Sequence, residues 1–183
     1  SQSTTRRARM SEDNLEPRPS VEPKLHSPEE VEMAVQSGNH DSLVIRETIA
    51  ALATQSRWRE LWIIADSMSK EVSILVDSAG MVWADVGTRG EVRLAPPRGS
   101  VIPYRFWLHS HPVDGYWSST DCDSLACYSM ILDEAIVLGH DHLKRTRRTR
   151  SPLVPVLGPG WPLSTWTDEP IVLYSDLGGP YVR

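Results

Sequence analysis

The stretch from His109 to Asp121, HSHPVDGYWSSTD, constrains the fold more than any other part of the sequence. It follows an apolar run, VIPYRFWLH, that predicts a β-strand, and it leads into residues 121–130, whose pattern predicts a helix. Pro112 ends the strand and turns the chain. The chain must therefore bring the end of a strand, a short loop and the start of a helix close together.

The two histidines of this stretch are suited to binding a metal ion. His109 and His111 are two residues apart in the predicted strand, so both imidazoles project from one side of it. Asp121 follows within one short loop and can supply a carboxylate as a third ligand. Two histidines and a carboxylate, with the fourth position left to water, are typical of a catalytic zinc site, whereas a structural site is usually closed by four protein ligands. The alternative for the HxH pair alone is two unrelated surface or core histidines.

The motif resembles that of the JAMM (MPN+, or JAB) metallopeptidase family, whose signature is a distant glutamate, then HxHP, about six residues, and SxxD. The matching residues in this chain are His109, His111, Pro112, Ser118 and Asp121. The loop VDGYW is one residue shorter than the family usually shows, so Ser119, in an SxD spacing, is an alternative to Ser118. The resemblance implies Zn²⁺ as the cofactor and a JAB/MPN, cytidine deaminase-like fold.

The resemblance also implies an activity, the zinc-dependent hydrolysis of peptide or isopeptide bonds. Ser118 would donate a hydrogen bond to the developing oxyanion, and an upstream glutamate would act as general base. Glu71, which opens a strand candidate, matches the layout of RadC-like and prokaryotic members, whereas Glu60 matches the deubiquitinase-type members. We favour Glu71. The family's substrates imply the extended C-terminal tail of a ubiquitin-like modifier joined to a lysine or to another peptide.

Two other functions remain open. The same fold occurs as inactive scaffold modules that only bind partners, although the complete set of ligands argues against this. A RadC-like association with nucleic acid is the second, suggested also by the basic run LKRTRRTR at 143–150. That run has no interleaved aromatic residues for base stacking, and we favour a solvated loop. A second HxH pair, His140 and His142, has no carboxylate at a matching distance, so we do not expect a second metal site.

The remaining patterns predict an α+β domain in which a curved, mostly antiparallel sheet packs against helices. Residues 1–26 are polar, charged and punctuated by proline, so we expect a disordered extension before a domain at 27–183. Ser27 and Asp41 or Ser42 can begin helices. Residues 58–69 fit either a helix or a strand.

Strands are expected at several places after residue 70. EVSILVD and MVWADVG, separated by the turn signal SAG, predict a hairpin. Further strand candidates are GEVRLAPP, EAIVLGHD, SPLVPVLG and EPIVLYSD.

Composition and charge restrict the cellular setting. The net charge of −5 gives no reason to expect nucleic acid or an anionic membrane as a partner, and no apolar run is long enough to span a bilayer. No secretory h-region is present at the N-terminus of the sequence. Cys122 and Cys127, five residues apart on a predicted helix, would lie on different faces and form no disulfide. We therefore expect a cytoplasmic protein.

Overall fold

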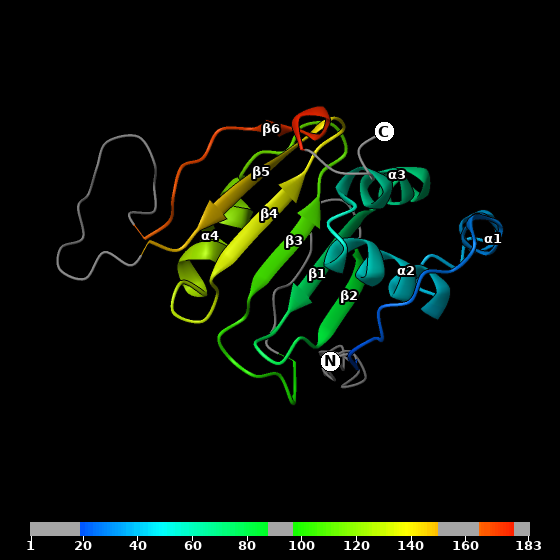
Figure 1. Ribbon diagram of the computed structural model, residues 1–183, viewed down its shortest axis with the longest axis horizontal. Helices are drawn as coiled ribbons and strands as arrows, with labels where there is room; N and C mark the ends of the chain where they lie inside the picture. Colours follow the sequence, from blue (N-terminus) through cyan, green and yellow to red (C-terminus); the bar gives the residue numbers. More distant parts are fainter. Residues whose placement is uncertain (1–18, 88–96, 150–164, 178–183) are drawn as a thin grey trace, which may run out of the picture.

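A six-stranded mixed sheet and four helices make up the part of the chain that the computed structural model describes, residues 19–87, 97–149 and 165–177 (Figure 1). The strand order is β2-β1-β3-β4-β5-β6, and β3 and β4 run parallel while the other neighbours are antiparallel. The strands are β1 (Glu71–Val76), β2 (Val82–Gly87), β3 (Phe106–Ser110), β4 (Glu134–Leu138), β5 (His142–Arg147) and β6 (Val172–Leu173). The expectation of an α+β domain with a mostly antiparallel sheet is confirmed.

The helices begin where the sequence offers capping residues. They are α1 (Pro28–Gln36), α2 (Leu43–Thr54), α3 (Trp58–Met68) and α4 (Ser119–Cys127). The hydroxyls of Ser27 and Ser42 accept hydrogen bonds from Glu30 N and Ile45 N at the starts of α1 and α2. The ambiguous stretch 58–69 is helical, and Trp58, Leu61, Trp62, Ala65 and Met68 form its buried side.

Helices cover both faces of the sheet (Figure 1). The side chains of the central strands β1 and β3 alternate between two apolar clusters, one on each face. In β1, Val72 and Ile74 belong to the larger cluster, which also contains the buried residues of α2 and α3. Leu75 and Trp107 belong to the second cluster, together with Leu125 of α4. His109 follows Trp107 by two residues, so it projects from the face that α4 covers.

The hairpin β1–β2 is closed by a buried carboxylate. Asp77 is 0% exposed, and its oxygens accept hydrogen bonds from the backbone N–H groups of Ala79, Met81 and Val101. Gly80 has φ +84°, which glycine adopts without steric cost. The predicted hairpin is therefore confirmed.

The basic run is a strand and not the loop that we expected. Residues 142–147 form β5 and pair with both β4 and β6. Its cations contact acidic side chains in the ion pairs Lys144–Asp168, Arg145–Glu134 and Arg147–Glu169, and Arg148 just beyond it contacts Asp133. The positive charge of the run is thus partly neutralised within the domain.

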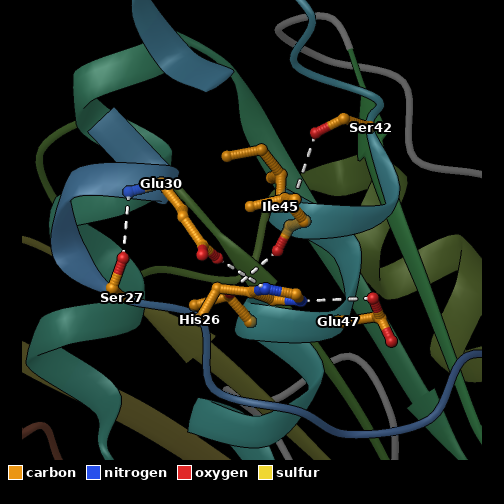
Figure 2. Close-up of polar contacts among 8 residues, drawn as sticks. His26, Ser27, Glu30, Ser42, Ile45 and Glu47 are labelled. Atoms are coloured by element: carbon orange, nitrogen blue, oxygen red, sulfur yellow. Dashed lines mark hydrogen bonds and ion pairs between the residues drawn. The ribbon is translucent and has the colours of Figure 1, made fainter. Parts of the chain in front are cut away.

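The last residues of the expected extension contact the domain. Val21 is only 7% exposed and pairs with Val82 of β2, so residues 19–26, which we assigned to the extension, pack on the domain. Figure 2 shows His26 between Glu30 and Glu47, at 3.0 and 3.2 Å, which fastens this segment to α1 and α2. Residues 1–18 of the expected extension lie outside the described residues.

Of the three other strand candidates, the structure describes one in full. Most of GEVRLAPP and all of SPLVPVLG fall outside the described residues. EPIVLYSD contains only the two-residue β6, because a 3₁₀ turn at Tyr174–Asp176 follows directly. Within the three described ranges, no helix combines the length and apolar character that crossing a membrane requires.

Candidate metal centre

Strand β3 ends at the two histidines and directs their rings to one place. The ring of His109 stacks on that of Trp107, with centroids 4.5 Å apart and an interplanar angle of 18°. The centroids of His109 and His111 are 5.0 Å apart. The backbone of His111 is held on both sides, since its N–H donates to Leu138 O and its carbonyl accepts from Trp62 Nε1 at 2.8 Å.

The SxxD motif is a capping box at the start of α4. The hydroxyl of Ser118 accepts a hydrogen bond from Asp121 N at 3.1 Å, and Asp121 Oδ2 accepts from Ser118 N at 3.0 Å. This reciprocal arrangement fixes the direction of the Asp121 carboxylate. The spacing of three residues between serine and aspartate is therefore the spacing that a helix start requires.

The two histidines and the carboxylate converge on one point. His109 Nε2 lies 3.0 Å from Asp121 Oδ1, and His111 Nε2 lies 3.3 Å from Asp121 Oδ2. One ligand atom from each of the three residues falls within 4.8 Å of the others, and no other such group occurs in the described part of the chain. The predicted metal ligands His109, His111 and Asp121 are therefore brought together, in a group that could bind a metal ion.

Burial provides a test of whether a cation fits this group. His109, His111 and Asp121 are 2%, 8% and 7% exposed, so their polar atoms are largely withdrawn from water. Neither ring nitrogen of His109 has a hydrogen-bond partner, although Nε2 lies close to the Asp121 carboxylate. A buried imidazole nitrogen without a partner is unfavourable, and a cation between His109 and Asp121 would provide the missing partner.

The ionisation of Asp121 suits the same role. Burial by itself would raise the pKa of Asp121, but the contacts with His109 and His111 and the hydrogen bond from Ser118 N outweigh it and hold the pKa well below its ordinary value. The carboxylate is therefore ionised near neutral pH, which is the form that binds a metal ion.

The two candidate general bases lie in different surroundings. Ser73 pairs with His109 across the β1–β3 ladder, and continuing this register by two residues places Glu71 opposite His111 on the same face of the sheet. Glu60 instead lies on α3, contacts Arg57 and lines a cavity of about 560 Å³ between the helices. No residue of the metal group lines that cavity. The geometry therefore favours Glu71 over Glu60.

The loop between the ligands carries two aromatic residues beside the centre. Tyr116 is 56% exposed and meets the ring of His111 edge-on at 4.8 Å. The ring centroids of Trp117 and His109 are 6.0 Å apart, and the buried Nε1 of Trp117 has no hydrogen-bond partner. Asp114 in the same loop and Asp123 on α4 are exposed and take no part in the metal group.

The second HxH pair does not belong to the metal group. His140 is exposed and packs edge-on against Trp62, whereas His142 is buried and contacts Asp141 and Gly115. Sequence reasoning missed the hydrogen bonds of His142 with Gly115 and of Trp62 with His111. The sequence signal for Trp62 was the helical stripe in residues 58–69, which by itself did not show that the helix approaches His111.

Comparisons with family models, curated proteins and solved structures gave no match to this chain. The family resemblance therefore depends on the sequence motif alone.

Proposed function

We propose that this protein is a zinc-dependent peptidase or isopeptidase of the JAMM type, with a JAB/MPN fold. The observation that carries the proposal is the convergence of His109, His111 and Asp121, buried and directed at one point. Three protein ligands with a fourth position for solvent distinguish a catalytic zinc site from a structural one. Zinc bound there would supply Lewis acidity and lower the pKa of a coordinated water molecule towards neutrality.

The chain's own residues supply the proton transfers. Glu71 is half-buried at the start of β1, on the face that carries the histidines. Its carboxylate would accept a proton as water attacks the carbonyl carbon and would later deliver that proton to the leaving amine. No covalent enzyme intermediate is required.

Ser118 would stabilise the charge that develops on the carbonyl oxygen. Its oxygen already accepts the hydrogen bond from Asp121 N, which holds the side chain in place. A hydroxyl that accepts one hydrogen bond can still donate its own proton, and such a donor is effective in a buried site.

The proposed substrate is the extended tail of a ubiquitin-like modifier, joined through its C-terminal carboxyl group to a lysine or to another peptide. The support for this substrate class is the family resemblance alone. The exposed ring of Tyr116 beside His111 offers an apolar surface for such a tail.

The rival functions have less support. A scaffold module needs no buried group of metal ligands, and here the group is complete. Association with nucleic acid would need free basic side chains, whereas those of β5 contact Asp168, Glu134 and Glu169.

The test combines zinc content with hydrolysis. Purified protein should contain about one zinc per chain and should cleave a fluorogenic amine from the C-terminus of a ubiquitin-like protein. His109→Ala should lose both zinc and hydrolysis. Hydrolysis by a zinc-free His109→Ala variant would contradict the proposal.

Two glutamate variants form a matched pair. Glu71→Gln should retain zinc and lose about 100-fold or more in kcat, the usual contribution of a general base. Glu60→Gln removes the same charge from α3 and should leave kcat unchanged. Loss of kcat in Glu60→Gln, with wild-type kcat in Glu71→Gln, would assign the general base to Glu60 and contradict the choice of Glu71 from the β1–β3 register.

A further inference from the structure

His142 lies directly beneath the loop that joins the metal ligands. It is the first residue of β5, is only 7% exposed, and its Nε2 accepts a hydrogen bond from Gly115 N at 3.0 Å. Gly115 is buried and stands midway between His111 and Ser118. His142 thus bonds to the centre of the loop on which the relative positions of the histidine ligands and Asp121 depend.

The hydrogen bonds of His142 define its tautomer. Because Gly115 N–H is a donor, Nε2 must be without a proton. The neutral ring then carries its proton on Nδ1, which lies 2.7 Å from Asp141 Oδ1. The contact with His142 lowers the pKa of Asp141, so the carboxylate is ionised and accepts the Nδ1–H. Asp141 therefore orients the ring whose other nitrogen bonds to the loop.

Two glycines permit the close approach. A Cβ on Gly139 would lie 2.5 Å from Gly115 N and 2.9 Å from His142 Nε2, and a Cβ on Gly115 would lie 3.1 Å from Val137 O. Side chains at these two positions would separate the loop from the turn that leads into β5.

Backbone hydrogen bonds reinforce the same contact. His111 N donates to Leu138 O at 2.9 Å, and His140 N donates to Val113 O at 2.8 Å. Residues 111–115 therefore lie against residues 138–142 along their length, and the His142 side chain provides the bond nearest to the middle of the loop.

We propose that His142, oriented by Asp141, is a positioning residue that sets the spacing between the histidine ligands and Asp121 by bonding to Gly115 N. This rests on the proposed metal centre but concerns a residue outside the group of ligands. His142 itself is not a ligand, because its Nε2 is taken by the loop amide. Its loss should weaken metal binding without removing any ligand.

The test measures zinc affinity by competition with a chromogenic chelator, for wild type and three variants. His142→Ala should weaken zinc binding by about 10- to 100-fold, the range usual for residues that orient metal ligands. His142→Gln should recover most of this loss, because a glutamine oxygen can reach the place of Nε2 and accept the same hydrogen bond. His40→Ala is the matched control, since His40 is also a partly buried histidine bonded to the backbone, at Val35 O, outside the site. It should bind zinc like wild type.

Three results would overturn the proposal. Zinc affinity in His142→Ala equal to that of wild type would show that the loop keeps its position without the imidazole. A glutamine variant as weak as the alanine variant would show that the accepted hydrogen bond is not what matters. Wild-type protein that binds no zinc would overturn the metal centre as well, and this outcome is recognised before any variant is made.

A spectroscopic measurement serves if His142→Ala does not fold. Nitrogen-15 shifts of wild-type His142 should show a protonated Nδ1 and a bare Nε2, with Nε2 coupled to the Gly115 amide through the hydrogen bond. The opposite tautomer would overturn the proposal.

Discussion

Ser118 has a role that the structure shows, capping α4, and a role that we propose, donating to the oxyanion, and removing its hydroxyl separates the two. Ser118 caps α4 by accepting from Asp121 N, while its own backbone N–H donates to the Asp121 carboxylate. Ser118→Ala loses the first hydrogen bond and keeps the second. Loss of an N-cap hydroxyl costs about 1 kcal/mol, which in a chain of this size lowers Tm by roughly 2–4 °C. The carboxylate stays oriented by the remaining bond, so zinc affinity should fall little.

The effect on catalysis should be larger than the effect on stability. Loss of one oxyanion donor lowers kcat by about 10²- to 10³-fold, or roughly 3–4 kcal/mol, which exceeds the cost of the cap. Ser118→Asn distinguishes the two effects. Asparagine caps a helix as well as serine does, but its amide group is one bond further from the backbone than the hydroxyl. The asparagine variant should therefore keep the wild-type Tm and lose activity.

The assay is thermal unfolding of the metal-free protein, followed by steady-state hydrolysis at full zinc occupancy. A Ser118→Ala variant with wild-type Tm would refute the energetic role of the capping box. A kcat within about threefold of wild type, where the proposed donor predicts at least about 10²-fold, would refute the role of the hydroxyl in catalysis.

Three further predictions concern the metal and the turn behind it. Zinc at about 100 times its Kd should stabilise the wild-type fold by about 2.7 kcal/mol, raising Tm by roughly 5–10 °C, and should leave the Tm of Asp121→Ala unchanged. The buried hydroxyl of Tyr174 donates to Gly139 O, and burial raises the pKa of Tyr174. The stability that the protonated hydroxyl contributes is therefore complete below the ordinary pKa of about 10 and is lost as pH rises from there through the raised pKa. Near neutral pH, Tyr174→Phe should be less stable than wild type by about 1 kcal/mol. At about pH 11 the difference between the two denaturant midpoints should be smaller. Gly139→Ala should lower the free energy of unfolding by about 1–3 kcal/mol in urea titrations and weaken zinc binding, because its Cβ would lie 2.5 Å from Gly115 N.

The parts of the structure that sequence reasoning predicted correctly are those with local causes. Ser27 and Ser42 cap helices through hydrogen bonds to backbone groups three residues away, so the signal lies within one turn. The convergence of the three proposed ligands has a similar local cause, since His109, His111 and Asp121 lie within one strand end, one loop and one helix start. Their convergence follows from strand periodicity and helix capping, both of which can be recognised in a short stretch.

The basic strand β5 was missed because its stabilising contacts come from distant segments. Its charged composition, taken alone, is typical of a solvated loop. In the structure, Glu134 of the neighbouring strand β4 pairs with Arg145, and Glu169, which lies shortly before β6, pairs with Arg147. The apolar contribution of β5 is small, with Leu143 as its buried aliphatic residue. Only the assembled sheet shows that the basic side chains of β5 form ion pairs with acidic side chains of neighbouring segments.

The choice between Glu71 and Glu60 shows why a ligand set is easier to predict than a complete active site. A motif search finds both glutamates at a suitable distance before HxHP, because spacing along the chain does not show which strand lies beside β3. The antiparallel pairing of β1 with β3 places Glu71 opposite His111, and the Ser110 hydroxyl strengthens this pairing by accepting a hydrogen bond from Val72 N at 3.0 Å. Ser110 stands between the two histidines, so the chain segment that presents the ligands also bonds to the residue next to Glu71. If Glu71 is the general base that we propose, a Ser110→Ala variant should lower kcat more than zinc affinity, because it removes a contact between the strands and leaves every proposed ligand in place.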